Sequence, residues 1–170
     1  MPDSSIDPTT DRLLRHMAWA NQALIARLAE QPDSALALTA PKNEWSAGRI
    51  LAHLVSAADN YAGRLEGGAR KEGSGQPTTA AELPALGERL AAIDARIREQ
   101  AAPAEGMAGY AGGDNWFPRS TVVAQAIHHA TEHRAQIAGA LSTNGNNAID
   151  LDAIDLWEFT EQEGGAVVPG

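Results

Sequence analysis

The stretch LPALGERLAAIDARI, from Leu83 to Ile97, decides the fold class. Its large apolar residues recur at alternating steps of three and four positions: Leu83, Leu86, Leu90, Ile93 and Ile97. That spacing places them on one face of an α-helix and is typical of the seam of a helical bundle. Thr79 and Glu82 have the spacing of a capping box, so we expect this helix to start at Thr79.

Three further segments show helical periodicity. They cover about residues 10–30, 46–66 and 120–142. Ser46 is a good N-cap for the second of them, and a tail segment, 149–163, could form a short fifth helix. Together they predict an all-α protein, a four-helix bundle with a short C-terminal segment, in one domain spanning residues 1–170 with residues 1–9 disordered.

Two connections differ from the helices in composition. Residues 66–78 are rich in Gly, Ser and Lys and predict a mobile loop. Residues 103–118 contain several glycines together with Tyr110, Trp116 and Phe117, which indicates a structured loop with a short hairpin.

Composition and charge exclude several classes of function. The chain has no cysteine, so disulfides, thiolate metal sites and cysteine nucleophiles are excluded. The net charge of −9 and the absence of a basic stripe argue against nucleic acid and against an anionic membrane surface as partners. No apolar run resembles a signal peptide or a membrane span. We therefore expect a cytoplasmic protein.

Five histidines are present, and the helical wheel separates them: His16, His53, His128, His129 and His133. His129 and His133 are four residues apart, so their rings lie one turn apart on one face of a helix. His53 lies at the edge of the apolar stripe of the second helix. If the second and fourth helices are neighbours, these three imidazoles could converge near the mouth of the bundle, whereas His128 points to solvent.

Three neutral imidazoles form a site suited to zinc, nickel or ferrous iron rather than magnesium or calcium. A three-histidine site also leaves a fourth position open for water or substrate, as a catalytic metal requires. The alternative is that the pair is incidental, because two histidines at this spacing are not rare on helices. His16 is expected to be a solvated surface residue. Trp19 lies on the same face and indicates either a second contact surface, such as a dimer interface, or a side chain covered by the loop or tail.

Three stretches of the sequence resemble motifs of a known family. The stretch WSAGRILAHL, from Trp45 to Leu54, resembles the motif of the DinB/YfiT-like family in which a Trp-Ser start leads to a metal-ligand histidine. The stretch HATEHRAQI, from His129 to Ile137, resembles the motif that supplies the other two ligands. The segment IDLWEF, 154–159, is similar to the family's C-terminal segment. Ala135 stands where a glycine is common in the family, and alanine is small enough to replace it.

The resemblance implies a bundle with a noncontiguous helix order, frequent homodimers and a metal centre formed by His53, His129 and His133. Some members of the family look like metal-dependent transferases or isomerases that use low-molecular-weight thiols, others were described as hydrolases by analogy of the site, and many have no known substrate. We therefore expect a metal-dependent enzyme with zinc or nickel, or else iron, and a small-molecule substrate, including a low-molecular-weight thiol. The alternatives are a non-catalytic metal-binding bundle and an interaction module without metal.

No catalytic residue is assigned from the sequence. Asn60 and Arg64 lie two and three turns beyond His53 on its face and could contact a substrate. Gln136 could orient a ligand from behind. Glu132 points beyond the edge ligand His129 and away from the core, so it is not assigned as a general base.

Overall fold

The computed structural model describes residues 6–102 and 106–165, and the described chain is built mainly from α-helices. The four long helices are α1 (Pro8–Ala29), α2 (Ala47–Leu65), α3 (Leu83–Gln100) and α4 (Arg119–Ser142). The short elements are the 3-10 helices η1 (Asp33–Ala37), η2 (Ala80–Glu82) and η3 (Asp152–Ile154), the helix α5 (Leu156–Gln162) and the strands β1 (Met107–Ala108) and β2 (Phe117–Pro118). The predicted all-α bundle is confirmed.

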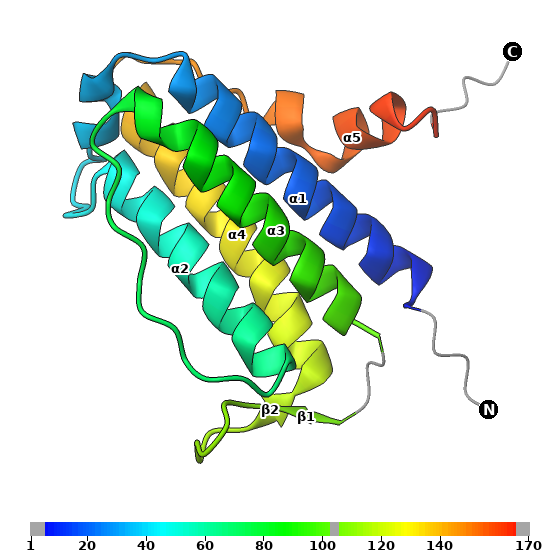
Figure 1. Cartoon of the computed structure of the whole chain (residues 1–170). Helices are drawn as coiled ribbons and strands as arrows, with labels where there is room; N and C mark the ends of the chain where they lie inside the picture. The colour runs from blue at the N-terminus through cyan, green and yellow to red at the C-terminus, as the bar shows by residue number, and fades with distance from the viewer. Residues whose placement is uncertain (1–5, 103–105, 166–170) are drawn as a thin grey trace, which may run out of the picture.

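The four long helices do not pack in the order of the chain. α1 lies against α3, α2 lies between α3 and α4, and α4 closes the bundle against α1 (Figure 1). The noncontiguous order implied by the resemblance is therefore present. Its consequence for the site is that α2 and α4, which hold the candidate histidines, are direct neighbours.

Side-chain caps explain where the helices start. The Ser46 hydroxyl accepts a hydrogen bond from the backbone N–H of Arg49, as expected for an N-cap. The predicted capping box is present, since the Glu82 carboxylate accepts from the backbone N–H of Thr79 at 2.9 Å. α1 starts earlier than expected, at Pro8, because the Asp7 carboxylate caps it by accepting from the N–H of Thr10.

The prediction that residues 1–9 are disordered is therefore wrong for Pro8 and Thr9. Pro8 and Thr9 form the first turn of α1. Proline suits this position because its fixed φ matches the helix and it has no N–H to leave unpaired. Residues 1–5 lie outside the described part of the chain.

The core lies along the axis of the bundle and includes the seam that the sequence predicted. Its largest fully buried side chains come from all four long helices: Leu14, Met17, Leu24, Leu28, Ile50, Leu51, Leu54, Leu83, Leu90, Ile97, Ile137 and Leu141. Burial of this apolar surface is the main force that stabilises the bundle. It also fixes the relative positions of α2 and α4.

A polar network crosses this core between α1, α3 and α4. The Arg134 guanidinium donates to the Asn21 side-chain oxygen at 2.8 Å, and the Asn21 amide donates to the Asp94 carboxyl at 3.0 Å. All three side chains are buried. Burial raises the pKa of Asp94 to about 7, although the Asn21 hydrogen bond and the Arg134 charge act in the opposite direction. Asn21 thus separates two buried groups of opposite charge.

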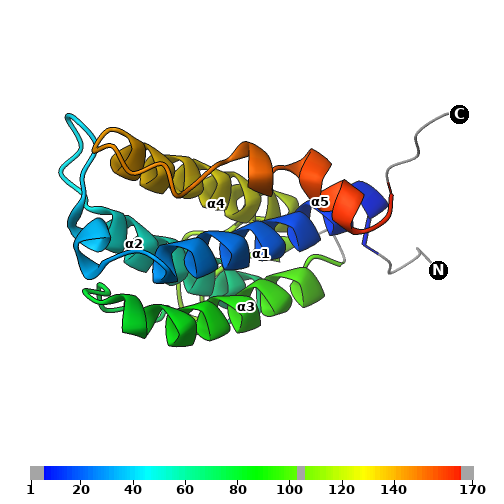
Figure 2. The ribbon, with the colours of Figure 1, turned by 90° about the horizontal axis from the view of Figure 1, so that it is seen from above.

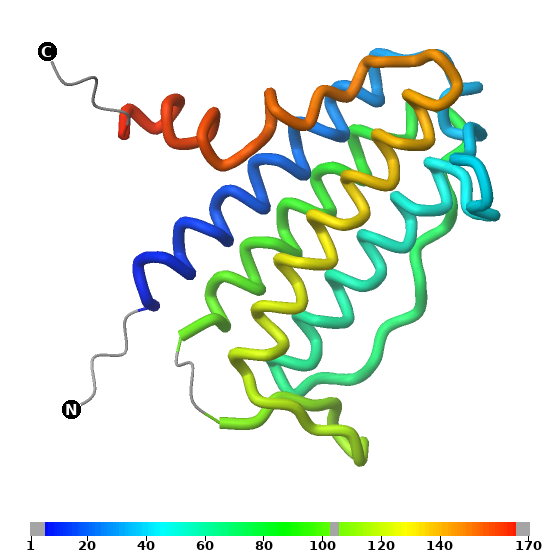
Figure 3. Tube along the Cα trace, turned by 180° about the vertical axis from the view of Figure 1, so that it is seen from behind, coloured from blue at the N-terminus to red at the C-terminus, as the bar shows by residue number. Residues whose placement is uncertain are grey.

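The connection from α2 to α3, expected to be a mobile loop, is tied to α2. The segment runs alongside α2 for most of its length (Figure 3). The backbone N–H of Ser74 donates to the Ser56 hydroxyl, and the Lys71 ammonium lies 3.0 Å from the Asp59 carboxylate. Asp59 also pairs with Arg89 and Arg96 of α3. Side-chain contacts that the composition did not indicate therefore hold this connection in place.

The predicted hairpin is present beyond the ends of α2 and α4. β1 and β2 pair in antiparallel fashion, with Ala108 opposite Phe117. Gly109 allows the close approach of Trp116, because a Cβ at position 109 would lie 2.6 Å from the indole ring. The Arg119 guanidinium donates to the carbonyl oxygens of Leu65 and Gln100, which fixes the hairpin to the ends of α2 and α3.

The C-terminal segment packs beside α1 (Figure 2) and corrects the prediction for His16. His16 is half-buried, not solvated, and its Nε2 lies 3.0 Å from the Ile154 carbonyl oxygen. The Phe159 ring of α5 lies 5.5 Å from the Trp19 ring, centroid to centroid. The tail thus covers Trp19, as the second interpretation of this residue predicted. The homodimer stays a prediction.

No described helix has both the length and the apolar character needed to cross a membrane.

Candidate metal centre

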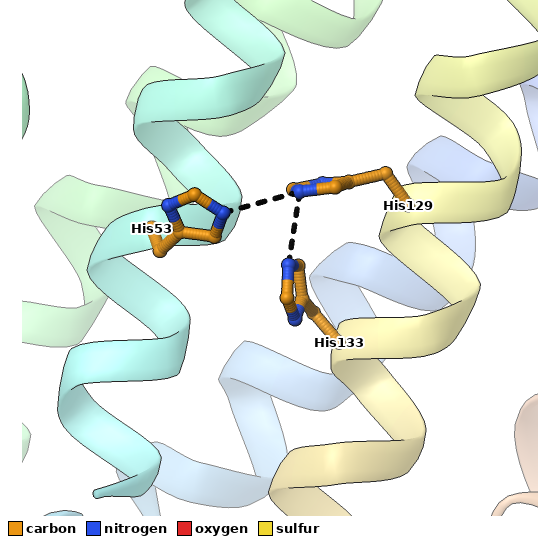
Figure 4. Close-up of side chains that lie close together, drawn as sticks. All are labelled: His53, His129 and His133. Atoms are coloured by element: carbon orange, nitrogen blue, oxygen red, sulfur yellow. Dashed lines mark hydrogen bonds between the residues drawn. The ribbon is translucent and has the colours of Figure 1, made fainter. Parts of the chain in front are cut away.

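The three histidines selected from the sequence come together between α2 and α4 (Figure 4). His53 projects from α2, and His129 and His133 project one turn apart from α4. The Nε2 atoms of His129 and His53 are 3.2 Å apart, and those of His133 and His129 are 2.9 Å apart. His133 is buried, whereas His53 and His129 are partly exposed, so the group is open to solvent on one side, near the middle of α4 rather than at an end of the bundle. His128 is exposed.

The spacing of these nitrogen atoms fits a metal ion. Nitrogen ligands at about 2.0–2.1 Å from a tetrahedral zinc ion are about 3.3–3.4 Å apart. The two short contacts in the group are within a few tenths of an ångström of that separation. The three histidines could therefore hold a metal ion with small movements of their rings.

The hydrogen bonds behind His133 fix which of its nitrogens faces the group. The Gln136 amide N–H₂ donates to the Glu132 carboxylate at 3.2 Å, so the Gln136 oxygen faces His133. His133 Nδ1 lies 2.7 Å from that oxygen and must carry the proton in the neutral ring. His133 Nε2 then presents its lone pair to the other histidines, which is the arrangement that metal-ligating histidines usually have.

The neutral state of the imidazoles also favours the binding of a metal ion. Burial, followed by the neighbouring rings of His133 and His53, lowers the pKa of His129 to about 4. Burial and His133 lower the pKa of His53 in the same direction. At neutral pH these imidazoles are uncharged, and a single N–H at His129 Nε2 cannot serve both short contacts well. A cation accepts the lone pairs of all three nitrogens at once.

Aromatic side chains border the group on two sides. The Trp45 ring lies edge-on to His53 at 5.0 Å between centroids, and the Arg49 guanidinium lies over Trp45. The Tyr61 ring lies edge-on to His129 at 5.5 Å, and Tyr61 and Gln125 line the same groove. These rings restrict the positions of the imidazoles and limit the access of water.

The other residues considered from the sequence have different outcomes. Gln136 contacts His133 as expected. The Asn60 side chain is used within the fold, because it accepts from the N–H of Lys71 and donates to the Ser56 carbonyl, so its expected contact with a substrate is not supported. The sequence reading missed Tyr61 as a neighbour of His129 and Glu132 as the group that orients Gln136. The four-residue spacing of Glu132 and Gln136 was the available signal for the latter.

We expect Gln136→Leu to weaken zinc binding by about 10- to 100-fold, as changes to groups behind metal ligands commonly do. The reason is that His133 Nδ1 loses its acceptor, so its tautomer is no longer fixed. Competition with a chromogenic chelator would measure the zinc affinity. Gln162→Leu is the matched control, because Gln162 has the same four-residue contact, with Glu158, on α5. Equal affinities of the two variants would contradict this role of Gln136.

Comparison with known proteins agrees with the fold. A model of the DinB family matches residues 1–164. The crystal structure of a DinB-like protein from Bacillus cereus ATCC 10987 is similar with a TM-score of 0.63 and 17% identity, covering 81% of this chain and 94% of that chain. No curated protein sequence matches this chain. At that identity the likeness to the crystal structure shows the fold alone.

Proposed function

This chain belongs to the DinB family, and we propose that it is a metal-dependent enzyme whose zinc or nickel ion is held by His53, His129 and His133. Iron is the third candidate metal. The main support is that three histidine nitrogens lie within 4.8 Å of one another and that no carboxylate joins them in the described ranges, 6–102 and 106–165. Structural zinc sites usually have four protein ligands, whereas catalytic sites have three and an open position.

The ion would supply a Lewis acid with one position open to a small molecule. The chain's own residues would fix that position. His133 is oriented by Gln136, and the Trp45 and Tyr61 rings limit rotation of the other two imidazoles. A site held in this way needs little rearrangement when a substrate binds.

Thiol transfer is favoured over hydrolysis. Many metal-dependent hydrolases also use a general base close to the open position, but the Glu132 carboxylate is exposed and is used by Gln136. Burial raises the pKa of Tyr61, which keeps its hydroxyl protonated at neutral pH. A thiol, with a pKa of about 8.5, gives up its proton far more readily than water does. We therefore propose a transferase that uses a low-molecular-weight thiol.

Paired assays of the zinc-loaded protein test this function. Glutathione, cysteine and 2-mercaptoethanol would each be supplied with 1-chloro-2,4-dinitrobenzene, in a reaction that forms a carbon–sulfur bond and releases chloride and the thiol proton. Hydrolysis of 4-nitrophenyl acetate would be followed in parallel. We expect metal-dependent thiol transfer that is absent from the metal-free protein and from His133→Ala.

Other outcomes would assign the alternatives. Metal-dependent hydrolysis without thiol transfer would identify a hydrolase. Neither reaction, together with a large fall in melting temperature when metal is removed, would support a non-catalytic metal-binding bundle.

A further inference from the structure

A groove adjoins the metal centre between the C-terminal half of α2 and the N-terminal half of α4. Its volume is about 300 Å³, and the hairpin borders it at one end. The residues that line it are Tyr61, Arg64, Phe117, Thr121, Val122 and Gln125. Tyr61 contacts both the groove and His129, and Gln125 precedes His129 by one turn. The groove and the metal centre therefore share Tyr61 as a common wall.

Arg64 gives the groove a fixed positive charge. Its guanidinium lies 4.3 Å from the Tyr110 ring centroid and 5.2 Å from that of Phe117, and its Nη1 donates to the Asn115 carbonyl at 3.0 Å. In the part of the chain that the structure describes, Arg64 forms no ion pair with a carboxylate. An arginine whose plane is already fixed can bind a carboxylate through two parallel N–H groups of one edge at little entropic cost. Arg64 thus provides a local positive charge in a chain whose net charge is −9.

The remaining lining determines the shape of the ligand. Phe117 and Val122 offer apolar surface, and Thr121, Gln125 and Tyr61 offer polar edges. Arg64 follows His53 by eleven positions, which is about 16 Å along the helix axis. The Arg64 guanidinium contacts Tyr110, Asn115 and Phe117, so it lies at the hairpin end of the groove. A short organic molecule held on Arg64 would therefore extend along the groove toward Tyr61, the lining residue that contacts His129.

We propose that this groove binds a small organic carboxylate, with the carboxylate on Arg64 and an apolar or aromatic body along Phe117 and Val122. The proposal rests on the proposed function in one respect, namely that this carboxylate is the substrate of the adjoining centre. The other possible role of Arg64 is to hold the hairpin through Tyr110, Phe117 and Asn115. Only the binding of a carboxylate by Arg64 predicts a preference for a charged ligand over a neutral one.

The test compares 4-phenylbutyrate with its neutral amide, 4-phenylbutyramide, by calorimetric titration of the full chain, both zinc-loaded and metal-free. We expect the carboxylate to bind about tenfold or more tightly than the amide in both forms, because it makes charge-assisted hydrogen bonds. Arg64→Gln should abolish this preference. Arg70→Gln, which changes an exposed arginine just beyond α2 that does not line the groove, should retain it.

Equal affinities of the acid and the amide, or a preference that survives Arg64→Gln, would overturn the proposal. So would an equal loss of both ligands in Arg64→Gln, because that result would show a role in holding the hairpin. The metal-free titration separates this inference from the proposed function. The preference for a carboxylate can be present in a protein that binds no zinc, and zinc can bind to a protein that shows no such preference.

Discussion

His133→Ala is expected to weaken zinc binding by about 100- to 1,000-fold. Structural zinc sites bind with about 10–16 kcal/mol over four ligands, so one ligand accounts for roughly 2.5–4 kcal/mol. His133 is the most buried of the three histidines and the one whose tautomer is fixed. Competition with a chelator would measure the affinity, and urea unfolding with and without zinc would measure the linked stability.

The linked stability should show the same loss. A ligand at 1,000 times its Kd stabilises the folded state by about 4.1 kcal/mol. In His133→Ala the same zinc concentration should stabilise the folded state by only about 0.4–1.4 kcal/mol. His128→Ala is the control, since His128 lies on the same helix but is exposed. Identical zinc affinities of the parent and His133→Ala would show that this residue is not a ligand.

Arg134→Met is expected to lower the free energy of unfolding by about 3–5 kcal/mol at pH 8, the usual cost of removing one member of a buried charged pair. Its removal leaves the Asn21 oxygen without a donor and the buried Asp94 carboxylate without a compensating charge. Urea unfolding at pH 8 would measure the change. The double variant Asp94→Leu, Arg134→Met should recover the part of the loss that comes from the Asp94 charge, because no buried charge is then left uncompensated, whereas buried Asn21 still lacks partners.

The pH dependence distinguishes this mechanism from simple loss of packing. The pKa of Asp94 in the folded state, about 7, lies above its ordinary value of 3.8. Between pH 3.8 and about 7 the Asp94 carboxyl is protonated in the folded state and ionised in the unfolded state. The contribution of Asp94 to the free energy of unfolding is therefore greatest in acid and is lost as the pH rises toward 7. Arg134→Met raises the pKa of Asp94 further, so its cost should be smaller at pH 5 than at pH 8. A cost that is the same at both pH values would contradict the account.

The sequence allowed the helices and the candidate ligands to be predicted because their signals are local. The seam from Leu83 to Ile97, the Ser46 cap and the spacing of His129 and His133 each depend on a few neighbouring positions. The approach of His53 to the other two depends on α2 lying beside α4. Periodicity does not specify that packing. The family resemblance implied a shared metal centre but left open whether the two helices are neighbours, and the structure shows that they are.

Features formed by distant residues could not be predicted. The Ile154 carbonyl contacts His16 through a tail whose position depends on tertiary packing, and for the same reason the sequence left open whether the tail covers Trp19. Asn21 and Arg134 are 113 positions apart in the chain, and neither residue type signals a buried contact. The groove beside Arg64 likewise requires α2, α4 and the hairpin to be in place.

The most direct test of the three-histidine centre is elemental analysis of the purified protein beside the His129→Ala, His133→Ala double variant. The account predicts close to one zinc or nickel ion, or else iron, per parent chain and none in the variant. A parent that contains no metal and takes up none when zinc, nickel or iron is added would contradict the proposed metal centre and favour a helical interaction protein.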